Sequence, residues 1–254
     1  MSSFIHKITD TVRAVCGKDD RIQPTAAIIV ASGSSTRMGE GISKQMIMLD
    51  GIPVVARTIM AFDACECIKE IIVVAREDEF YLYREFQRLY KFKKLVRLVA
   101  GGKTRQDSVK NGFRAISRGT KFVAIHDGAR CLITPEQIET ICSEAYKNGC
   151  ATAATRAVDS VKISNGKNRF IDKSANRNHI WLAQTPQVFR AETYEMALRA
   201  AERDGLEVTD DNSLVENLGV SIKLVECGRA NLKITTQDDI PMALAIIRSR
   251  EEKV

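Results

Sequence analysis

Short apolar segments rich in β-branched residues alternate with longer segments of helical period along most of the chain. This alternation is typical of parallel strands joined by crossover helices. Several of the short segments are too apolar to leave either face of a sheet in water, so we expect helices on both faces. The pattern predicts an α/β fold with a mostly parallel sheet, with strands at 26–31, 70–75, 96–100, 122–126, 152–158, 220–226 and 232–235.

Two helix starts are marked by capping residues. Thr104 precedes Asp107, and Thr134 precedes Gln137, at the spacing of a capping box. A proline at the first helical position supports the second start. Gly149 is then expected to end that helix.

Two segments do not fit the alternating pattern. Residues 164–180 contain the turn pair Asn165-Gly166, many polar side chains and no helical period, which predicts a protruding hairpin or β-arm. The first residues place Phe4, Ile8 and Val12 near one helical face and predict an added helix. We therefore expect an amino-terminal extension over 1–24 and one domain over 25–254, with a dimerisation arm at about 160–182.

Composition narrows the class of protein. The chain has 254 residues, of which 44% are hydrophobic and 28% charged, as in soluble globular proteins. It has neither a run of roughly 18 apolar residues, as a membrane span needs, nor the apolar core of a signal peptide at its start. The seven cysteines are odd in number and include no C-x-x-C pair. These features predict a cytoplasmic protein with reduced thiols that pack in the core rather than bind metal.

The formal net charge of +6 is compatible with nucleic acid, an acidic membrane surface or small anionic substrates. The distribution of the positive charge along the sequence distinguishes between these partners. The only dense basic run, Lys91, Lys93 and Lys94, is typical of a solvated surface. We therefore expect small phosphorylated substrates, and neither nucleic acid nor a membrane.

The first candidate binding loop follows the first predicted strand. Small residues allow backbone N–H groups to approach an anion at the carboxyl edge of a sheet, where open α/β folds bind ligands. The loop differs from both the Walker A and the G-x-G-x-x-G motifs, so an ordinary turn remains an alternative. Lys44 adds a second cation, with a solvated surface lysine as its alternative reading. The loop consists of Ala31, Ser32, Gly33, Ser34 and Ser35, followed by the cation Arg37.

Further polar residues follow later strands. Gly102 and Lys103, with Ser108 on the next helix, form an arrangement able to seat a nucleobase, although a plain turn also fits. Asp127 and Arg130 end an otherwise apolar strand, where a core has no need of charge. Asp127 is thus a candidate for contact with a metal, a ribose or a substrate hydroxyl. The chain's three scattered histidines make no metal cluster, and the one beside Asp127 is expected to be structural.

The order of these pieces resembles that of the 2-C-methyl-D-erythritol 4-phosphate cytidylyltransferase family. The resemblance covers about residues 26–246 and implies a Rossmann-like fold of the nucleotide-diphospho-sugar transferase type. Seven ordered motifs carry it: 31–38 with Ser43-Lys44-Gln45, 101–105 with Ser108-Val109, 126–130, 158–162, Arg177 with Trp181 and 184–187, Thr209-Asp210-Asp211, and 231–235.

The resemblance implies an enzyme that joins CTP to a sugar-alcohol phosphate, and it implies roles for individual residues. Arg37 and Lys44 are expected to hold the triphosphate, and Arg177 and Lys233 the sugar phosphate. Magnesium, held in part by the phosphates, is the expected cofactor, with Asp127 as a possible ligand. The cytosine is expected against Ser32, Gly102, Lys103 and Ser108, and the acceptor against Asp127, Arg130, Ser160 and Thr185. A homodimer formed through the arm is also implied.

Two alternatives differ from this reading. A cytidylyltransferase for ribitol 5-phosphate shares the fold, the phosphate loop and the segment at 184–187, but Lys162 and the run 177–181 look more like the methylerythritol type. A non-catalytic nucleotide-binding module is the second alternative. It has no need of two separate cation pairs, so the presence of all four cations argues against it.

Overall fold

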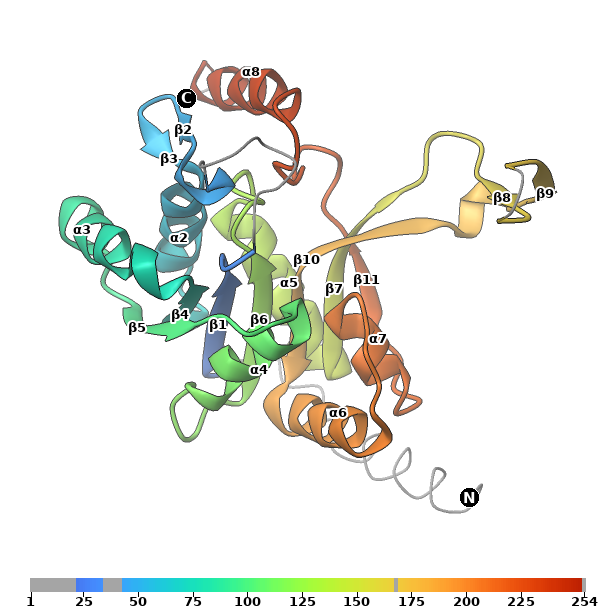
Figure 1. Ribbon diagram of the computed structural model, residues 1–254, viewed down its shortest axis with the longest axis horizontal. Helices are drawn as coiled ribbons and strands as arrows, with labels where there is room; N and C mark the ends of the chain where they lie inside the picture. Colours follow the sequence, from blue (N-terminus) through green and yellow to red (C-terminus); the bar gives the residue numbers. More distant parts are fainter. Residues whose placement is uncertain (1–21, 34–42, 167–168, 253–254) are drawn as a thin grey trace.

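The computed structural model describes residues 22–33, 43–166 and 169–252. Among these, seven strands form one sheet in the order β11-β7-β10-β6-β1-β4-β5 (Figure 1). Only β10 runs antiparallel to its neighbours within this described sheet, which confirms the mostly parallel sheet expected from the sequence. The strands are β1 (Thr25–Val30), β4 (Ile68–Ala75), β5 (Leu95–Ala100), β6 (Phe122–Asp127), β7 (Cys150–Arg156), β10 (Trp181–Arg190) and β11 (Lys223–Glu226).

Helices cover both faces of the sheet. Successive side chains of a strand point to opposite faces, and the buried strands place apolar side chains on each. Ala27 and Ile29 of β1 pack in one apolar cluster, and Ile28 packs in the other. Three helices cover the first face: α2 (Val54–Ala64), α3 (Phe80–Tyr90) and α5 (Pro135–Asn148). Three others cover the second: α4 (Arg105–Arg114), α6 (Ala191–Asp204) and α7 (Asp211–Glu216).

A third apolar cluster lies at one end of the sheet. There α8 (Asp239–Glu251) packs beside the short β2 (Met48–Leu49) and β3 (Ile52–Pro53) (Figure 1). Ala243 and Ile247 of the helix are buried with Ile234 in this cluster. The cluster thus anchors the segment just before α8 over the end of the sheet.

The predicted helix caps are present. The Thr104 side chain accepts from the Asp107 N–H while the Asp107 carboxylate accepts in return from the Thr104 N–H, and Thr134 and Gln137 form the same box. Gly149 ends α5 with a φ of 84°, a backbone conformation that disfavours a side chain. These caps fix where α4 and α5 begin relative to the sheet.

A long excursion between β7 and β10 projects from the body (Figure 1). It carries a small antiparallel pair, β8 (Lys162–Ser164) and β9 (Ile171–Ser174), and the short 3₁₀ turn η4 (Arg177–His179). Phe170 and Ile171 near its tip are 70% and 65% exposed. We call residues 157–180 the arm. Apolar side chains this exposed suit contact with another surface.

Two expectations about strands were wrong. Residues 232–235 form no strand, because β6 is already paired by β1 and β10 and leaves them no free sheet edge. The strand β10, which begins at Trp181, was not expected at all. Its run of polar residues is buried against tertiary partners and does not show the apolar pattern of a core strand.

Among the described residues, no helix combines the length and apolar character that crossing a membrane requires. The helix expected from the pattern at 4–15 lies outside the described residues.

Candidate active site

The carboxyl ends of β1, β5 and β6 meet at one edge of the sheet. Beyond the strand ends, the Gly101 N–H donates to the Ala75 carbonyl at 3.0 Å and the Gly128 N–H donates to the Val30 carbonyl at 2.8 Å. These bonds hold the following loops together around a cavity of about 400 Å³. Four of its described lining residues are cationic and only one is acidic: Lys44, Lys103, Arg105 and Lys233 against Asp127. Such an excess of positive charge suits an anionic ligand.

Asp127, the last residue of β6, lies among three cations. One carboxylate oxygen, Oδ2, is 2.7 Å from the Lys233 Nζ, and Oδ1 is 3.5 Å from the Arg105 Nε. The Arg130 Nε lies 3.8 Å from Oδ2. Burial alone raises the pKa of Asp127, but the positive charges outweigh burial and hold that pKa well below its usual range. Asp127 is therefore ionised at neutral pH and orients the cations around it.

Lys233 comes from a different part of the chain and is placed by backbone contacts. The Ile234 N–H donates to the Ala129 carbonyl at 2.9 Å, and the Arg130 guanidinium donates to the Asn231 carbonyl at 2.8 Å. Asn231, fully buried, donates in turn to the Thr185 carbonyl at 2.9 Å. The segment is thereby tied to β6 and β10, which brings Lys233 to Asp127.

His126 and Thr185 support Asp127 from within the sheet. The His126 Nε2 lies 3.2 Å from the Arg130 carbonyl, which can only accept, so this nitrogen carries the proton. The Thr185 hydroxyl then donates to Nδ1 at 3.0 Å and accepts from the Asp127 N–H, also at 3.0 Å. Burial lowers the pKa of His126 to about 3, in agreement with a neutral ring. The expectation of a structural His126 agrees with this arrangement.

The loop after β5 forms another wall of the cavity. The Ser108 hydroxyl donates to the Thr104 carbonyl and accepts from the Gly102 N–H, each at 3.0 Å. The Ser32 hydroxyl donates to the Ser108 hydroxyl at 3.1 Å. A Cβ at Gly101 would lie 2.4 Å from the Ser32 Cβ, so only glycine permits this approach of the two loops. The result is a polar shelf of backbone and hydroxyl groups.

Proteins of known family resemble this chain over most of its length. The family model described as 2-C-methyl-D-erythritol 4-phosphate cytidylyltransferase matches residues 25–249. The chain belongs to this family. A member from Pelotomaculum thermopropionicum is 38% identical over 230 residues, which is 90% of this chain and 96% of that protein. A member from Caldanaerobacter subterraneus subsp. tengcongensis is 39% identical over 224 residues, 88% of this chain and 98% of that protein.

Solved structures of family members agree with the fold. The 4-diphosphocytidyl-2C-methyl-D-erythritol synthase from Anaerococcus prevotii superposes with a TM-score of 0.80 at 29% identity, covering 89% of this chain and 96% of that one. The 2-C-methyl-D-erythritol 4-phosphate cytidylyltransferase from Thermus thermophilus gives 0.70 at 27%, covering 89% and 100%. These relatives confirm the resemblance found in the sequence and favour the methylerythritol reading over the ribitol alternative.

The structure gathers part of the site residues expected for a family member. Eight of the expected residues line the cavity: Ser32, Gly33, Lys44, Gly102, Lys103, Ser108, Asp127 and Lys233. Ala31 is buried at the end of β1, and Arg130 lies behind Asp127. Ser34, Ser35 and Arg37 lie outside the described residues.

Three expected acceptor contacts lie elsewhere. Ser160 and Arg177 are exposed on the arm, where the Arg177 guanidinium donates to the Val158 carbonyl at 2.8 Å. Thr185 was expected in the arm region but belongs to β10, where its hydroxyl is buried against His126. Within this chain, the described residues of the arm are therefore not among those that line the Asp127 cavity.

Arg105 is the residue of the cavity that sequence reasoning missed. It is part of a motif that carries the resemblance, but no role was expected for it. Its guanidinium lies between Asp127 and Asp211, with 2.7 Å from Nη1 to the Asp211 Oδ2. Apart from that motif, the available signal was the charge that follows a predicted helix cap, because Asp211 lies 106 positions further along the chain.

The donor set around the cavity limits how a metal can bind. In the described part of the chain, no three His, Cys, Asp or Glu side chains gather in a metal-binding group, and Asp127 is the single carboxylate of the cavity wall. Magnesium usually takes one or two carboxylates and completes its shell with water and substrate phosphates. These residues therefore fit a magnesium ion that arrives with phosphate and not one held by protein alone.

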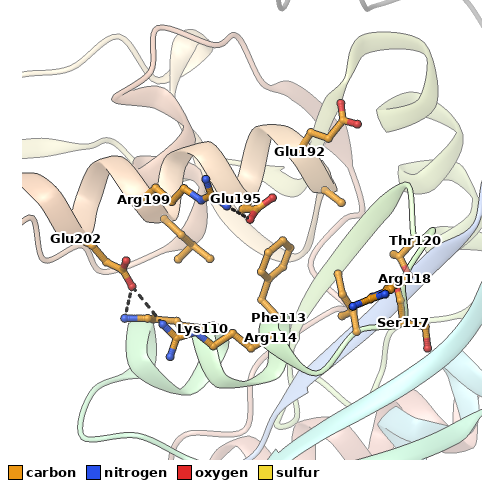
Figure 2. Close-up of a pocket in the computed structure, with 13 residues that line it drawn as sticks. Lys110, Phe113, Arg114, Ser117, Arg118, Thr120, Glu192, Glu195, Arg199 and Glu202 are labelled. Carbon is orange, nitrogen blue, oxygen red and sulfur yellow. Dashed lines mark hydrogen bonds and ion pairs between the residues drawn. The ribbon is translucent and has the colours of Figure 1, made fainter.

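A second cavity, of about 510 Å³, lies between α4 and α6, and we call it the α4–α6 groove (Figure 2). Its apolar lining includes Phe113 and Leu198. Five of its charged residues form ion pairs: Glu202 contacts Lys110 and lies 3.7 Å from Arg114, and Glu195 lies 2.6 Å from Arg199. The groove is larger than the Asp127 cavity but has nearly balanced charge.

Proposed function

We propose that the chain transfers the cytidylyl group of CTP to 2-C-methyl-D-erythritol 4-phosphate and releases pyrophosphate. The observation that carries this proposal is the excess of cations around Asp127 and Lys233, at the sheet edge of a chain that belongs to this family. Two anionic substrates must meet in such a site. Fixed positive charge lowers the repulsion between them.

The reaction needs positioning more than covalent help from the protein. A phosphate oxygen of the acceptor attacks the α-phosphorus of CTP, a new P–O bond forms, and the bond to the β-phosphate oxygen breaks. The electron pair of that bond leaves with pyrophosphate. Developing charge on the equatorial oxygens is stabilised by preorganised cations, for which we propose Arg37 and Lys44.

For the nucleotide, we propose that cytosine lies against the shelf formed by Ser32, Gly102 and Ser108, with Lys103 at its edge. The support is geometric, since hydroxyl and backbone groups of this shelf lie in one wall of the cavity. Magnesium, when bound with the triphosphate, offsets the negative charge of the leaving pyrophosphate. Asp127 is the protein oxygen ligand that we propose for it.

For the acceptor, we propose that Lys233 and Arg177 hold the phosphate. Lys233 is supported by its place in the cavity, whereas Arg177 lies on the exposed arm. We therefore propose a homodimer in which the arm of one subunit brings Arg177 and Ser160 to the cavity of the other. The exposed Phe170 and Ile171 supply apolar surface for this contact.

We also propose a cytoplasmic location. The six cysteines among the described residues are free and buried, as expected for a protein kept under reducing conditions. The hydrogen bond with Cys67 and burial raise the pKa of Cys65, which makes this thiol unreactive. These thiols pack in the core and carry none of the proposed chemistry.

The test is a pyrophosphate assay with CTP, magnesium and each acceptor in turn. We expect release of pyrophosphate with 2-C-methyl-D-erythritol 4-phosphate and a far lower kcat/KM with ribitol 5-phosphate. A site built to hydrogen-bond one hydroxyl pattern rejects the other by roughly 10⁴-fold. Equal or better turnover of the ribitol compound overturns the acceptor assignment. CTP binding without turnover of either compound favours a nucleotide-binding module instead.

A further inference from the structure

Arg105 bridges two carboxylates at the wall of the Asp127 cavity. Its guanidinium is 2.7 Å from Asp211 and 3.5 Å from Asp127, so the shorter contact is to the residue outside the cavity lining. The Arg105 side chain is 28% exposed, whereas that of Asp211 is 1% exposed. Asp211 therefore contacts the cavity through Arg105 and not directly.

Asp211 is itself held in place by further hydrogen bonds. Its Oδ1 accepts from the Tyr194 hydroxyl at 2.6 Å, while its N–H donates to the Gln187 side-chain oxygen at 3.1 Å. The Tyr194 ring stacks on Phe189 with 5.3 Å between ring centroids and tilts against Phe113 at 5.2 Å. A carboxylate held this firmly gives Arg105 one defined position.

This position has a consequence for Asp127. Because Arg105 is drawn toward Asp211, it meets only Oδ1 of Asp127, and Oδ2 remains available for the 2.7 Å contact with Lys233. Without the Asp211 charge, the Arg105 guanidinium is attracted to Asp127 alone and competes with Lys233 for the same carboxylate. Lys233 is the cation proposed to hold the acceptor phosphate.

We propose that Asp211 is a positioning residue of the transfer reaction, acting through Arg105 to keep Asp127 paired with Lys233. This inference rests on the proposed function, because turnover is what it explains. A network with a purely structural role makes a different prediction: its loss lowers ligand binding and turnover together. If Asp211 has a positioning role, its loss lowers turnover without weakening ligand binding.

The test compares kcat with the Kd for CTP, measured by calorimetry without acceptor. Asp211→Asn keeps the size of the side chain and removes one negative charge near an anion site, so we expect CTP to bind as tightly as in the parent or more tightly. We expect kcat to fall about tenfold, within the range of coupling between residues in contact. In an Arg105→Ala background, Asp211→Asn should lower kcat no further.

Two additional variants serve as a milder change and as a control. Tyr194→Phe removes only the hydroxyl that fixes Asp211 and should lower kcat less than Asp211→Asn does, which keeps the proposal testable if the latter misfolds. Glu202→Gln is the matched control, because it breaks an ion pair to the same helix α4 in the α4–α6 groove (Figure 2) and should change neither quantity.

The outcomes are separable. A parental kcat in Asp211→Asn, a parental kcat in Tyr194→Phe where Asp211→Asn does not fold, a loss of CTP affinity in step with kcat, or additive effects in the Arg105→Ala background each overturn the positioning role. If the parent turns over neither acceptor, the proposed function fails. The positioning role then fails with it, whereas a parent that turns over 2-C-methyl-D-erythritol 4-phosphate at the same kcat as its Asp211→Asn variant overturns the positioning role alone.

Discussion

The Asp127 cavity and the α4–α6 groove are built from two ends of the same helix. The first turn of α4 gives Arg105 to the Asp127 cavity, and later turns give Lys110 and Arg114 to the groove. In the cavity, three cations converge on one carboxylate whose side chain is 12% exposed. In the groove, Glu202 is 44% exposed and shares its charge with solvent and with nearby cations.

This difference shows that volume is a poor guide to an anion site. The groove is the larger space, about 510 Å³ against 400 Å³. Among the described residues, the groove is lined by four cations and three carboxylates, whereas the cavity is lined by four cations and one carboxylate. Exposed ion pairs gain little because water screens them. Charges at the edge of a sheet, partly withdrawn from water, act on a ligand far more strongly.

The largest expected effect is on turnover. Lys44→Ala or Lys233→Ala removes a cation from the cavity and should lower kcat on the order of 100-fold, the usual effect of losing one preorganised contact to a developing charge. For Lys44→Ala, CTP affinity should fall less than kcat. Lys110→Ala in the groove is the matched control and should retain parental kcat. If Lys110→Ala lowers kcat as much as Lys44→Ala or Lys233→Ala does, the cations of the cavity are not special to turnover.

The next effect is on stability. Arg105→Ala leaves Asp211 as a buried carboxylate without its cation. Because the Arg105 side chain is 28% exposed, we expect the free energy of unfolding in urea to fall by about 2 kcal/mol, the contribution of a charge-assisted hydrogen bond. Adding Asp211→Asn removes that charge and should restore part of the loss. Equal stability of the single and double variants contradicts a buried pair at this point.

A smaller effect appears in the pH dependence of stability. The cations around Asp127 hold its pKa below the value of about 4 that it has when unfolded. Its ionised form therefore stabilises the fold above pH 4, and this contribution is lost as the pH falls through the folded pKa. The difference in unfolding free energy between the parent and Asp127→Asn should shrink from pH 6 toward acid. A constant difference speaks against an ionised, ion-paired Asp127.

The smallest effect belongs to the groove. Glu202→Gln should leave the urea midpoint unchanged within error, both at low and at high salt, because the side chains of Glu202 and Arg114 are 44% and 65% exposed. If Glu202→Gln lowers the urea midpoint at low salt but not at high salt, the groove charges stabilise the protein more than their exposure suggests.

Continuous apolar segments predicted β1, β4 and β6, because these strands are almost entirely buried. This signal failed for β10, where Gln184, Thr185 and Gln187 are buried but polar. Their partners lie far away in sequence: the Gln187 side-chain oxygen accepts from the Asp211 and Asn212 N–H groups. No local pattern shows that such a polar segment is satisfied in the core.

The candidate site was predictable where a motif follows a strand. Asp127 and the shelf residue Ser108 were found because the ends of parallel strands meet at one sheet edge. Lys233 was found only through the family resemblance, since it lies on a loop tied to β6 by tertiary hydrogen bonds. The role of Arg105 depends on Asp211 and becomes visible only in three dimensions.

The most direct test is a crystal structure of the protein with CTP, magnesium and 2-C-methyl-D-erythritol 4-phosphate. The account predicts electron density for the triphosphate beside Lys44, for cytosine against Gly102 and Ser108, and for the acceptor phosphate at Lys233. Density for CTP in the α4–α6 groove, with the Asp127 cavity empty at saturating nucleotide, would contradict it.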